Sequence, residues 1–345
     1  MAVDRISKAR PFLAWTARMW SAIALTMLVG GCLVLQRRSG SLPSARTPID
    51  AVGRQERAEC GREEGNKGYL PPCPATPPGL QGKLEVREDI SLEETVKELA
   101  DGVRVGGSWS PPQCLPRWKI AIIVPFRDRQ SQVGPFLYHM HKFLQRQQLN
   151  YTIYIVEQEG TDLFNRARLL NVGYLQALTD GPFDCYAFHD IDMLPEDDRH
   201  LYHCSPQPRH LAVAASNQNY RSSHSLAYNK YFGGACLMTQ EHLARVNGWS
   251  NIYWGWGGED DDMWRRLSFE NIPVWRFPAS VARYKTIKHD PQTVNKKRYQ
   301  TLQRNTGRYP HDGLSTIKYV IKSRVSHPLY TYILANIGTP PKPLT

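Results

Sequence analysis

The chain has 345 residues, which is enough for one large domain or two small ones with a sizeable core. Its formal net charge of +11 suits an anionic partner such as a nucleic acid, a nucleotide diphosphate or a membrane surface. No zinc-finger, RNA-recognition or basic-zipper pattern accompanies the charge, so we expect no nucleic-acid partner. The seven cysteines include no C-x-x-C pair, which argues against a zinc site or a thioredoxin-type redox site and favours a few disulfides.

The N-terminal segment has the pattern of a membrane anchor. Residues 1–18 carry four basic side chains, and residues 19–36 form an uncharged run rich in Leu, Ala, Val and Ile that two arginines close. The run is near the lower end of the length that crosses a bilayer as a helix. A cleaved signal peptide is the alternative, because Gly30-Gly31-Cys32 resembles a cleavage site, but its apolar core would usually be shorter. We expect a cytoplasmic tail at 1–18 and a transmembrane signal anchor at 19–36, with the rest of the chain in the lumen.

A change in composition separates the anchor from the main domain. From residue 37 to residue 112 the sequence is rich in Pro, Gly, Ser and charged residues and has little apolar periodicity. Such a stretch buries too little surface to fold by itself. We interpret residues 37–72 as a disordered stem and residues 73–345 as the folded lumenal domain. Residues 84–99 carry apolar side chains among acids, and we expect them to form a strand or a short helix on that domain.

Strands and helices alternate in the main domain. Residues 120–124 are a β-branched run that ends at a proline, and residues 151–156 and 185–188 read as further buried strands. Amphipathic residues 136–148 and 165–177 predict the helices between them. This order predicts an α/β fold with a mostly parallel central sheet flanked by helices. Ligands bind at the carboxyl ends of the strands in such sheets.

The stretch at residues 254–263, W-G-W-G-G-E-D-D-D-M, interleaves two tryptophans with three glycines and adds four carboxylates. Glycines let a backbone hinge and approach a ligand closely, and tryptophan faces offer sugar rings an apolar platform. Helix capping is the alternative, since acids in a first turn favour a helix that would start near Met263. Capping does not require the W-G-W-G-G that precedes the acids. We favour a mobile loop that delivers one carboxylate as a catalytic base.

A second acidic motif, Asp190-Ile191-Asp192, directly follows the third strand. Such pairs often lie in surface turns, but closely set oxygens at a rigid strand end suit a hard cation such as Mg²⁺ or Mn²⁺. A metal there would hold a diphosphate and neutralise the charge on a departing one. Arg127 and Arg166 are placed to pair with a nucleotide, and Phe126 or Phe164 to stack on its base. For each aromatic alone, core packing explains the residue equally well.

Six motifs occur in a characteristic order. They are P-F-R-D-R at 125–129, F-N-R-A at 164–167, L-N-V-G at 170–173, D-I-D at 190–192, Y-F-G-G at 231–234 and W-G-W-G-G-E-D-D-D at 254–262. Together they resemble the β-1,4-galactosyltransferases, which are Golgi glycosyltransferases with a GT-A-type fold. The resemblance extends from about residue 73 to residue 340 and implies that the lumenal domain is catalytic.

The resemblance implies an inverting transfer of galactose from UDP-galactose to the 4-OH of a terminal GlcNAc on a glycoprotein or glycolipid. The implied donor-binding residues are Pro125, Phe126, Arg127, Phe164, Arg166, Asp190, Tyr231, Gly234, Trp256 and Glu259. The implied acceptor-binding residues are Asp260, Asp261, Arg298, Tyr299 and Leu302, and Asp260 is also the implied catalytic base. The bulk of Tyr231 implies a donor without an N-acetyl group at C2.

The implied metal is Mn²⁺, with Mg²⁺ as a tolerated substitute, and its implied ligands are Asp192 and His289. Thr286 lies three residues before His289, where many family members have a methionine ligand, so the third protein ligand is left open. The segment from His289 to Arg298 is also shorter than in the best-known members, which affects the implied acceptor pocket.

The resemblance further implies disulfides between Cys73 and Cys114 and between Cys185 and Cys204, in keeping with an oxidising lumen. It implies a single-pass type II protein of the Golgi membrane. Asn150 begins a sequon, Asn-Tyr-Thr, that abuts a predicted strand.

Three alternatives differ in class or specificity. An enzyme of the same fold and mechanism could use UDP-GalNAc or UDP-GlcNAc as donor, or xylose or glucose as acceptor. A carbohydrate-binding protein without catalysis would also keep the tryptophans, but it has little reason to keep Asp192, Asp260 and His289 together. A basic nucleic-acid-binding protein is the third alternative, and the membrane anchor argues against it.

Overall fold

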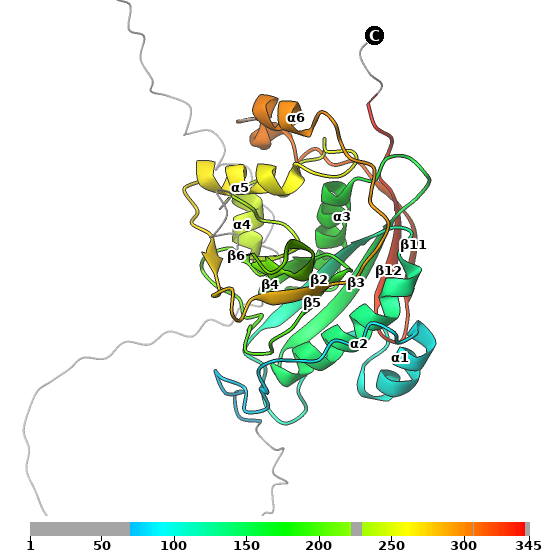
Figure 1. Ribbon diagram of the computed structural model, residues 1–345, viewed down its shortest axis with the longest axis vertical. Helices are drawn as coiled ribbons and strands as arrows, with labels where there is room; N and C mark the ends of the chain where they lie inside the picture. The colour runs from blue at the N-terminus through cyan, green and yellow to red at the C-terminus, as the bar shows by residue number, and fades with distance from the viewer. Residues whose placement is uncertain (1–69, 222–229, 306, 342–345) are drawn as a thin grey trace, which may run out of the picture. The chain divides into compact units, whose positions relative to one another are not determined.

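A nine-stranded mixed sheet forms the centre of the folded unit (Figure 1). The computed structural model describes residues 70–221, 230–305 and 307–341, all of them within the compact unit Asn66–Thr345. The expected cytoplasmic tail and membrane anchor, and all of the expected stem except residues 70–72, lie outside the described residues. No helix among the described residues is long and apolar enough to cross a membrane.

The main sheet has the strand order β11-β12-β3-β2-β4-β8-β6-β9, and β1 pairs with β3 beside this path. Its centre is parallel, because β2 pairs in parallel with both β3 and β4, and β3 in parallel with β12. The β8 strand joins antiparallel to β4 and β6. The strands are β1 Ser108–Trp109, β2 Lys119–Phe126, β3 Asn150–Gln158, β4 Cys185–His189, β6 Arg209–His210, β8 Ala235–Met238, β9 Trp275–Arg276, β11 Val320–Ser326 and β12 Thr331–Asn336.

A second, three-stranded sheet has the order β5-β10-β7. Its strands are β5 Met193–Pro195, β7 Ala214–Ala215 and β10 Arg283–Thr286. The helices of the described unit are α1 Leu92–Leu99, α2 Gln130–Arg146, α3 Arg166–Leu178, α4 Gln240–Arg245, α5 Glu259–Phe269 and α6 Arg298–Arg304, with 3₁₀ turns at Ala100–Gly102, Ser216–Gln218 and Tyr309–His311.

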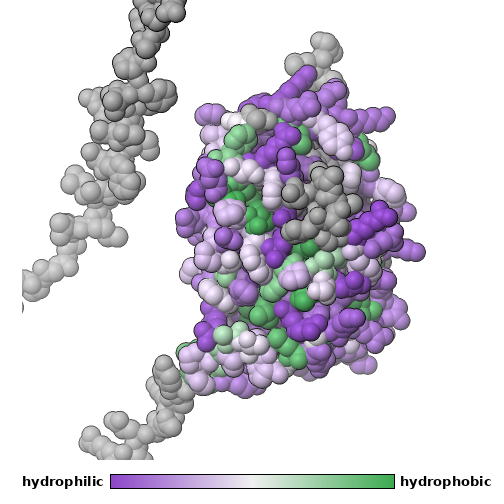
Figure 2. Space-filling model, turned by 60° about the vertical axis from the view of Figure 1, so that its left-hand side comes forward, coloured by the Kyte–Doolittle hydropathy of each residue, from purple (hydrophilic) through white to green (hydrophobic). Residues whose placement is uncertain are grey.

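Helices cover both faces of the central strands (Figure 1). Successive side chains of a strand point to opposite faces. Accordingly Ile120, Ile122 and Val124 pack in one apolar cluster with α2, whereas Ala121 and Ile123 pack in a second cluster with α3. The continuous apolar run of β2 is therefore the pattern of a strand buried on both sides. On the face drawn in Figure 2, apolar side chains gather only in patches between hydrophilic ones.

The predicted strands and helices are present, but some boundaries differ. The β2 strand continues through Pro125 to Phe126. Its pairing with β4 stops at Ile123, so Pro125 is paired with β3 alone, as a proline at the edge of a sheet can be. The α2 helix begins at Gln130, six residues before the predicted start, and contains Pro135. The predicted strand or helix at 84–99 is the α1 helix, which Ser91 caps through a reciprocal hydrogen-bond pair with Glu94.

Both implied disulfides are present. Cys73 is bonded to Cys114, and Cys185, the first residue of β4, is bonded to Cys204. Among the described cysteines, Cys236 is free and buried. The first bridge fastens the N-terminal part of the unit to the segment that leads into β2, because the backbone of Cys73 also donates to Leu115 O over 2.8 Å.

Candidate active site

A cavity of about 540 Å³ lies at the carboxyl ends of β2 and β4. Its walls come from the residues that follow β2 and β4, the start of α3, the 254–258 loop, the first turn of α5 and the segment from His289 to Tyr299. These segments lie far apart in the sequence. The position agrees with the expectation that ligands bind at the carboxyl ends of parallel strands.

Asp190 and Asp192 enter the cavity directly after β4. The backbone N–H of Asp190 donates to Gly234 O over 2.8 Å, which fixes the turn against the loop before β8. Arg166, the first residue of α3, donates from Nε to Asp190 Oδ1 over 2.6 Å. Burial raises the pKa of Asp190 to about 6, and the positive charge of Arg166 opposes this rise.

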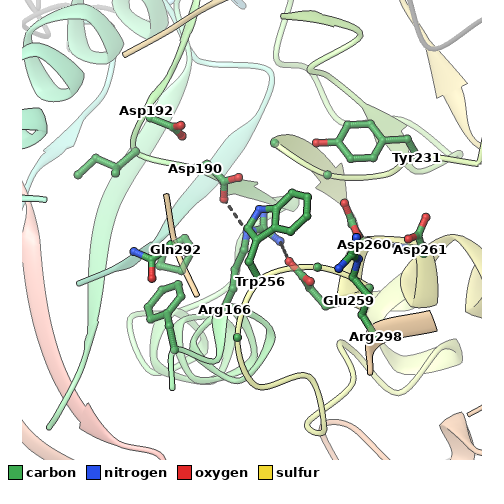
Figure 3. Close-up of a pocket in the computed structure, with 18 of the residues that line it drawn as sticks. Arg166, Asp190, Asp192, Tyr231, Trp256, Glu259, Asp260, Asp261, Gln292 and Arg298 are labelled. Atoms are coloured by element: carbon green, nitrogen blue, oxygen red, sulfur yellow. Dashed lines mark hydrogen bonds and ion pairs between the residues drawn. The ribbon is translucent and has the colours of Figure 1, made fainter. Parts of the chain in front are cut away.

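Arg166 also links the Asp190 turn to α5. Its Nη1 lies 3.7 Å from Oε1 of Glu259, and Figure 3 shows the guanidinium between the two carboxylates. Burial, followed by the negative charge of Asp260, raises the pKa of Glu259 to about 7. Glu259 Oε2 and both Nη atoms of Arg166 are buried without a hydrogen-bond partner in the described part of the chain. These atoms are therefore available to a ligand.

The acidic run lies in a helix, and this corrects our expectation of a loop. Residues 259–262 form the first turn of α5, which begins four residues before the predicted start at Met263. Gly258 precedes them at φ 102°, where an added Cβ would lie 2.8 Å from the Tyr253 ring. The capping interpretation is thus correct in geometry, because four carboxylates stand at the positive end of the helix dipole. Three of them, Glu259, Asp260 and Asp261, also line the cavity.

Asp260 and Asp261, the two partly buried acids of this turn, have perturbed pKa values. Burial raises the pKa of Asp260, and the charge of Arg166 opposes this. Burial likewise raises the pKa of Asp261 to about 6, against the charges of Arg265 and Arg298. Asp260 Oδ1 accepts a hydrogen bond from the backbone of Asp261 over 2.9 Å, which orients its carboxylate. A carboxylate with a raised pKa is a stronger base when ionised.

The W-G-W-G-G loop joins two walls of the cavity. Gly255 N donates to Phe164 O and Trp256 N donates to Thr293 O, each over 2.8 Å. The Trp256 side chain is 59% exposed, whereas Trp254 is 7% exposed and packs in the core. The exposed indole is therefore the one that can cover a bound sugar.

The residues present fit a divalent metal at one end of the cavity. His289 Nε2 lies 3.1 Å from Asp192 Oδ2, and the Asp192 hydrogen bond raises the pKa of His289. Two ligands at right angles around an ion with bonds near 2.1 Å would be about 3.0 Å apart, so both atoms can face one ion. Thr286 does not line the cavity, and its hydroxyl donates to Met193 Sδ over 3.5 Å.

Residues 73–205 match the model of the N-terminal region of glycosyl transferase group 7, and residues 209–290 match the model of the N-terminal domain of galactosyltransferase. Beta-1,4-galactosyltransferase 3 of Bos taurus is 44% identical over 279 residues, which cover 79% of this chain and 69% of that protein. Beta-1,4-galactosyltransferase 2 of Mus musculus is 40% identical over 282 residues, 80% of this chain and 75% of that protein.

This chain belongs to the β-1,4-galactosyltransferase family. It is therefore an enzyme, as the resemblance implied. The crystal structure of the catalytic domain of Drosophila beta1,4galactosyltransferase 7 in complex with xylobiose is 31% identical, has a TM-score of 0.51, and covers 64% of this chain and 94% of that chain. The α/β, GT-A-type fold predicted from the sequence is confirmed.

In this member of the galactosyltransferase family, most of the implied site residues share the one cavity. The lining includes Pro125, Arg127, Phe164, Arg166, Asp190, Asp192, Tyr231, Gly234, Trp256, Glu259, Asp260, Asp261, His289, Arg298 and Tyr299. Three implied residues do not line it: Phe126 packs in the core at 3% exposure, Leu302 is on the buried side of α6, and Thr286 faces Met193.

Four polar residues of the lining were not expected from the sequence. These are Arg129, Gln132, Gln218 and Gln292. Gln132 is 2% exposed, and neither polar atom of its amide has a partner among the described residues. Arg129 donates from Nη2 to Asp290 O over 3.1 Å and thereby joins the start of α2 to the His289 segment. Only Arg129 carried a signal, because it belongs to the P-F-R-D-R motif.

Proposed function

We propose that this protein transfers galactose from UDP-galactose to the 4-OH of a terminal GlcNAc, with inversion at the anomeric carbon. The observation that carries the proposal is the shared cavity: Asp260 and Asp261 of α5 and the Asp190-Ile191-Asp192 turn line the same space of about 540 Å³. Family membership supports the same reaction. A second crystal structure of the Drosophila beta1,4galactosyltransferase 7, that of a mutant, contains manganese, UDP-Gal and xylobiose.

The donor would lie along the wall formed by β2, α3 and the 254–258 loop. Pro125, Arg127 and Phe164 would contact the uridine, and the Arg127 guanidinium already lies 5.2 Å from the Phe164 ring centre. Asp190, Gly234 and Glu259 would contact the ribose and galactose through oxygen and backbone atoms. Arg166 would hold Asp190 and Glu259 in place, because its side chain bridges them.

The acceptor would approach from the side of α6. Arg298 and Tyr299 line that end of the cavity, and Arg298 lies within 5.6 Å of the Trp256 ring centre. Asp261 would accept a hydrogen bond from the acceptor sugar. Asp260 would remove the proton of the 4-OH as the oxygen attacks the anomeric carbon, and the bond to UDP breaks in the same step. One base is sufficient for this inverting displacement, so no carboxylate nucleophile is needed.

Asp192 and His289 would hold Mn²⁺, with Mg²⁺ as a weaker substitute. The bound ion would neutralise the negative charge that develops on the departing UDP. A nitrogen ligand beside a carboxylate favours Mn²⁺ over Mg²⁺. The two chain segments that carry these ligands are held together in the structure by the backbone bond from Ile287 N to Asp192 O, 2.8 Å long.

Replacement of Asp260 by Asn tests the proposal. The amide keeps the shape of the side chain but cannot take the proton, so kcat with UDP-galactose and free GlcNAc should fall by about 10² or more. The KM for UDP-galactose should stay close to that of the wild type. The matched control is Glu241→Gln, on the exposed surface of α4, which should leave both constants unchanged. An Asp260→Asn enzyme with near wild-type turnover would contradict the assignment and leave the acids with a capping role only.

Xylose remains the second candidate acceptor, because the relative solved with xylobiose shares 31% identity with this chain. A competition assay with equal concentrations of GlcNAc and β-xyloside distinguishes the two. Predominant galactose transfer to the xyloside would overturn the GlcNAc assignment while the donor assignment stands.

The cellular location is proposed on separate grounds. The 19–36 run would anchor the protein in the Golgi membrane with its catalytic domain in the lumen, and the two disulfides support an oxidising compartment. Protease added to intact Golgi vesicles should spare the catalytic domain and cleave it once detergent is present. Cleavage in intact vesicles would refute the type II orientation. Asn150 would be a glycosylation site, and loss of an N-glycan from the Asn150→Gln variant would show its use.

A further inference from the structure

A strongly basic segment borders the acceptor end of the cavity. Five of the thirteen residues from 296 to 308 are Lys or Arg, and none is acidic. They comprise Lys296, Lys297, Arg298, Arg304 and Arg308, carried by α6 and its two ends (Figure 1). We call this set the α6 basic rim.

Four cations of the α6 basic rim are exposed and form no ion pair among the described residues. Lys296, Lys297, Arg304 and Arg308 are all exposed. None of the ion pairs found among the described residues involves any of these four. Four uncompensated cations in so short a segment repel one another, and an anion that binds there would relieve this repulsion.

Helix geometry sets two of these cations on one outward face. Lys297, which caps α6, and Arg304 are seven residues apart, which is about two turns at 3.6 residues per turn. Leu302 points to the other side, where it is 7% exposed and its carbonyl accepts a hydrogen bond from Arg265 over 2.7 Å. The buried side of α6 thus faces α5, and the Lys297 and Arg304 side chains face solvent.

The rim is continuous with the cavity through Arg298 and Tyr299, which line its acceptor end. Tyr299 is 61% exposed and Trp256 is 59% exposed, and the Arg298 guanidinium lies near both rings, at 4.5 Å and 5.6 Å from their centres. Exposed aromatic rings pack on the apolar faces of sugars, and cations between and beside them bind negative substituents. This combination is suited to a negatively charged sugar chain.

We infer that the α6 basic rim binds an anionic oligosaccharide acceptor, with negative groups on the sugars that precede its terminal residue. The inference rests on the proposed function, because it extends the acceptor side of the same site. The terminal sugar would occupy the cavity beside Asp260 and Asp261, whose charges disfavour an anion on that sugar itself. The inner sugars would cross the rim, where a sulfate ester or a carboxylate meets Lys296, Lys297 and Arg304.

Three GlcNAc-terminated oligosaccharides of equal length test the inference. One is neutral, one has a sulfate ester on the sugar next to the terminal GlcNAc, and one has a uronic acid at that position. We expect the KM of at least one charged acceptor to be lower than that of the neutral one by about fivefold or more at low salt, with the difference shrinking as added salt shortens the Debye length. The charged acceptor with the lower KM identifies sulfate or carboxylate as the group that the rim binds.

The variant Lys296→Gln/Lys297→Gln/Arg304→Gln should bring the charged and neutral KM values within about twofold of each other, with kcat for the neutral acceptor unchanged. The matched control removes exposed charge elsewhere, through Lys97→Gln on α1 and Lys318→Gln, and should keep the wild-type preference. The α1 helix lies at the opposite end of the unit from α6 (Figure 1).

Binding of the sulfated oligosaccharide, measured by calorimetry without donor, should weaken in the rim variant and not in the control. The inference would be overturned by equal KM values for charged and neutral acceptors in the wild type, or by an unchanged preference in the rim variant. In either case, galactose transfer to the neutral acceptor would still support the proposed function. Equally tight binding of a single-stranded DNA or of anionic lipid vesicles would also overturn it, because the rim would then not select a sugar chain. If the wild type transfers galactose to none of the three acceptors, both the proposed function and the inference are refuted.

Discussion

The buried cation Arg166 offers the sharpest test of how the site is held together. It pairs with Asp190 over 2.6 Å and lies 3.7 Å from Glu259, and its own side chain is 14% exposed. Arg166→Met keeps the approximate length of the side chain but leaves both carboxylates without their cation. Removing one partner of a buried pair costs about 3–5 kcal/mol, and the partial exposure of Asp190 favours the lower end, about 3 kcal/mol.

The melting temperature of the purified protein measures this loss. At about 2–4 °C per kcal/mol, the Arg166→Met variant should melt about 6–12 °C below the wild type at neutral pH. Arg166→Lys, which keeps the charge without the planar fork, should lie in between. The matched control is Arg245→Met, because the exposed pair of Arg245 with Glu270 should contribute less than about 1 kcal/mol.

The pH dependence of the deficit has a definite sign. The pKa of Glu259 is about 7 in the folded protein, which is above the value of about 4.3 for an unfolded glutamate. A raised folded pKa means that ionisation of Glu259 destabilises the fold as the pH rises. Loss of Arg166 raises this pKa further, so the deficit of the variant should be larger at pH 8 than at pH 6. A deficit below about 2 °C, which corresponds to less than about 1 kcal/mol, or a deficit that grows on acidification would refute the counter-ion role.

Three further predictions concern donor, metal and disulfides. Tyr231→Leu should raise transfer from UDP-GalNAc relative to UDP-galactose, because it removes bulk from the cavity wall beside Gly233 and Asp260; wild-type enzyme that uses both donors equally would contradict this. Thr286→Met should leave the ratio of Mn²⁺-supported to Mg²⁺-supported activity unchanged, because the Thr286 side chain faces Met193 and does not line the cavity; a raised ratio, as a softer thioether ligand would give, would show that residue 286 reaches the metal. Cys185→Ala/Cys204→Ala should lower the free energy of unfolding by about 3 kcal/mol, measured by urea denaturation, and a loss below about 1 kcal/mol would show that the bridge is dispensable.

Local pattern determined much of this protein. The β-branched run at 120–124 predicted a buried strand, and the structure confirms it as β2. The acidic motif at 190–192 directly follows the predicted strand 185–188, so it was expected at a carboxyl strand end, where it lies after β4. The helix predicted at 165–177 is α3, which begins one residue later at Arg166; Asn165 caps it by accepting from Arg168 N over 3.0 Å, a bond between near neighbours. Such features depend on residues within a few positions of one another, and a sequence displays them directly.

The family resemblance predicted most of the residues that line the cavity, but it did not predict their contacts or every helix boundary. The start of α2 was missed because Gly134 and Pro135 resemble a helix break. In the folded unit, Gly134 lets α2 approach the backbone at the start of α1 so closely that an added Cβ would lie 2.6 Å from Leu92 N. Only tertiary packing makes the glycine favourable at that position.

The electrostatics of the site were likewise decided by tertiary structure. Arg166 is 24 residues from Asp190 in the sequence, and Glu259 lies on another helix, so no local pattern shows that one cation serves both acids. From composition alone, the four acids at 259–262 could belong to a loop or to a helix start. In the structure they form the first turn of α5, which begins directly after Gly258 at φ 102°. Burial then set their pKa values, because it depends on segments brought together across the whole domain.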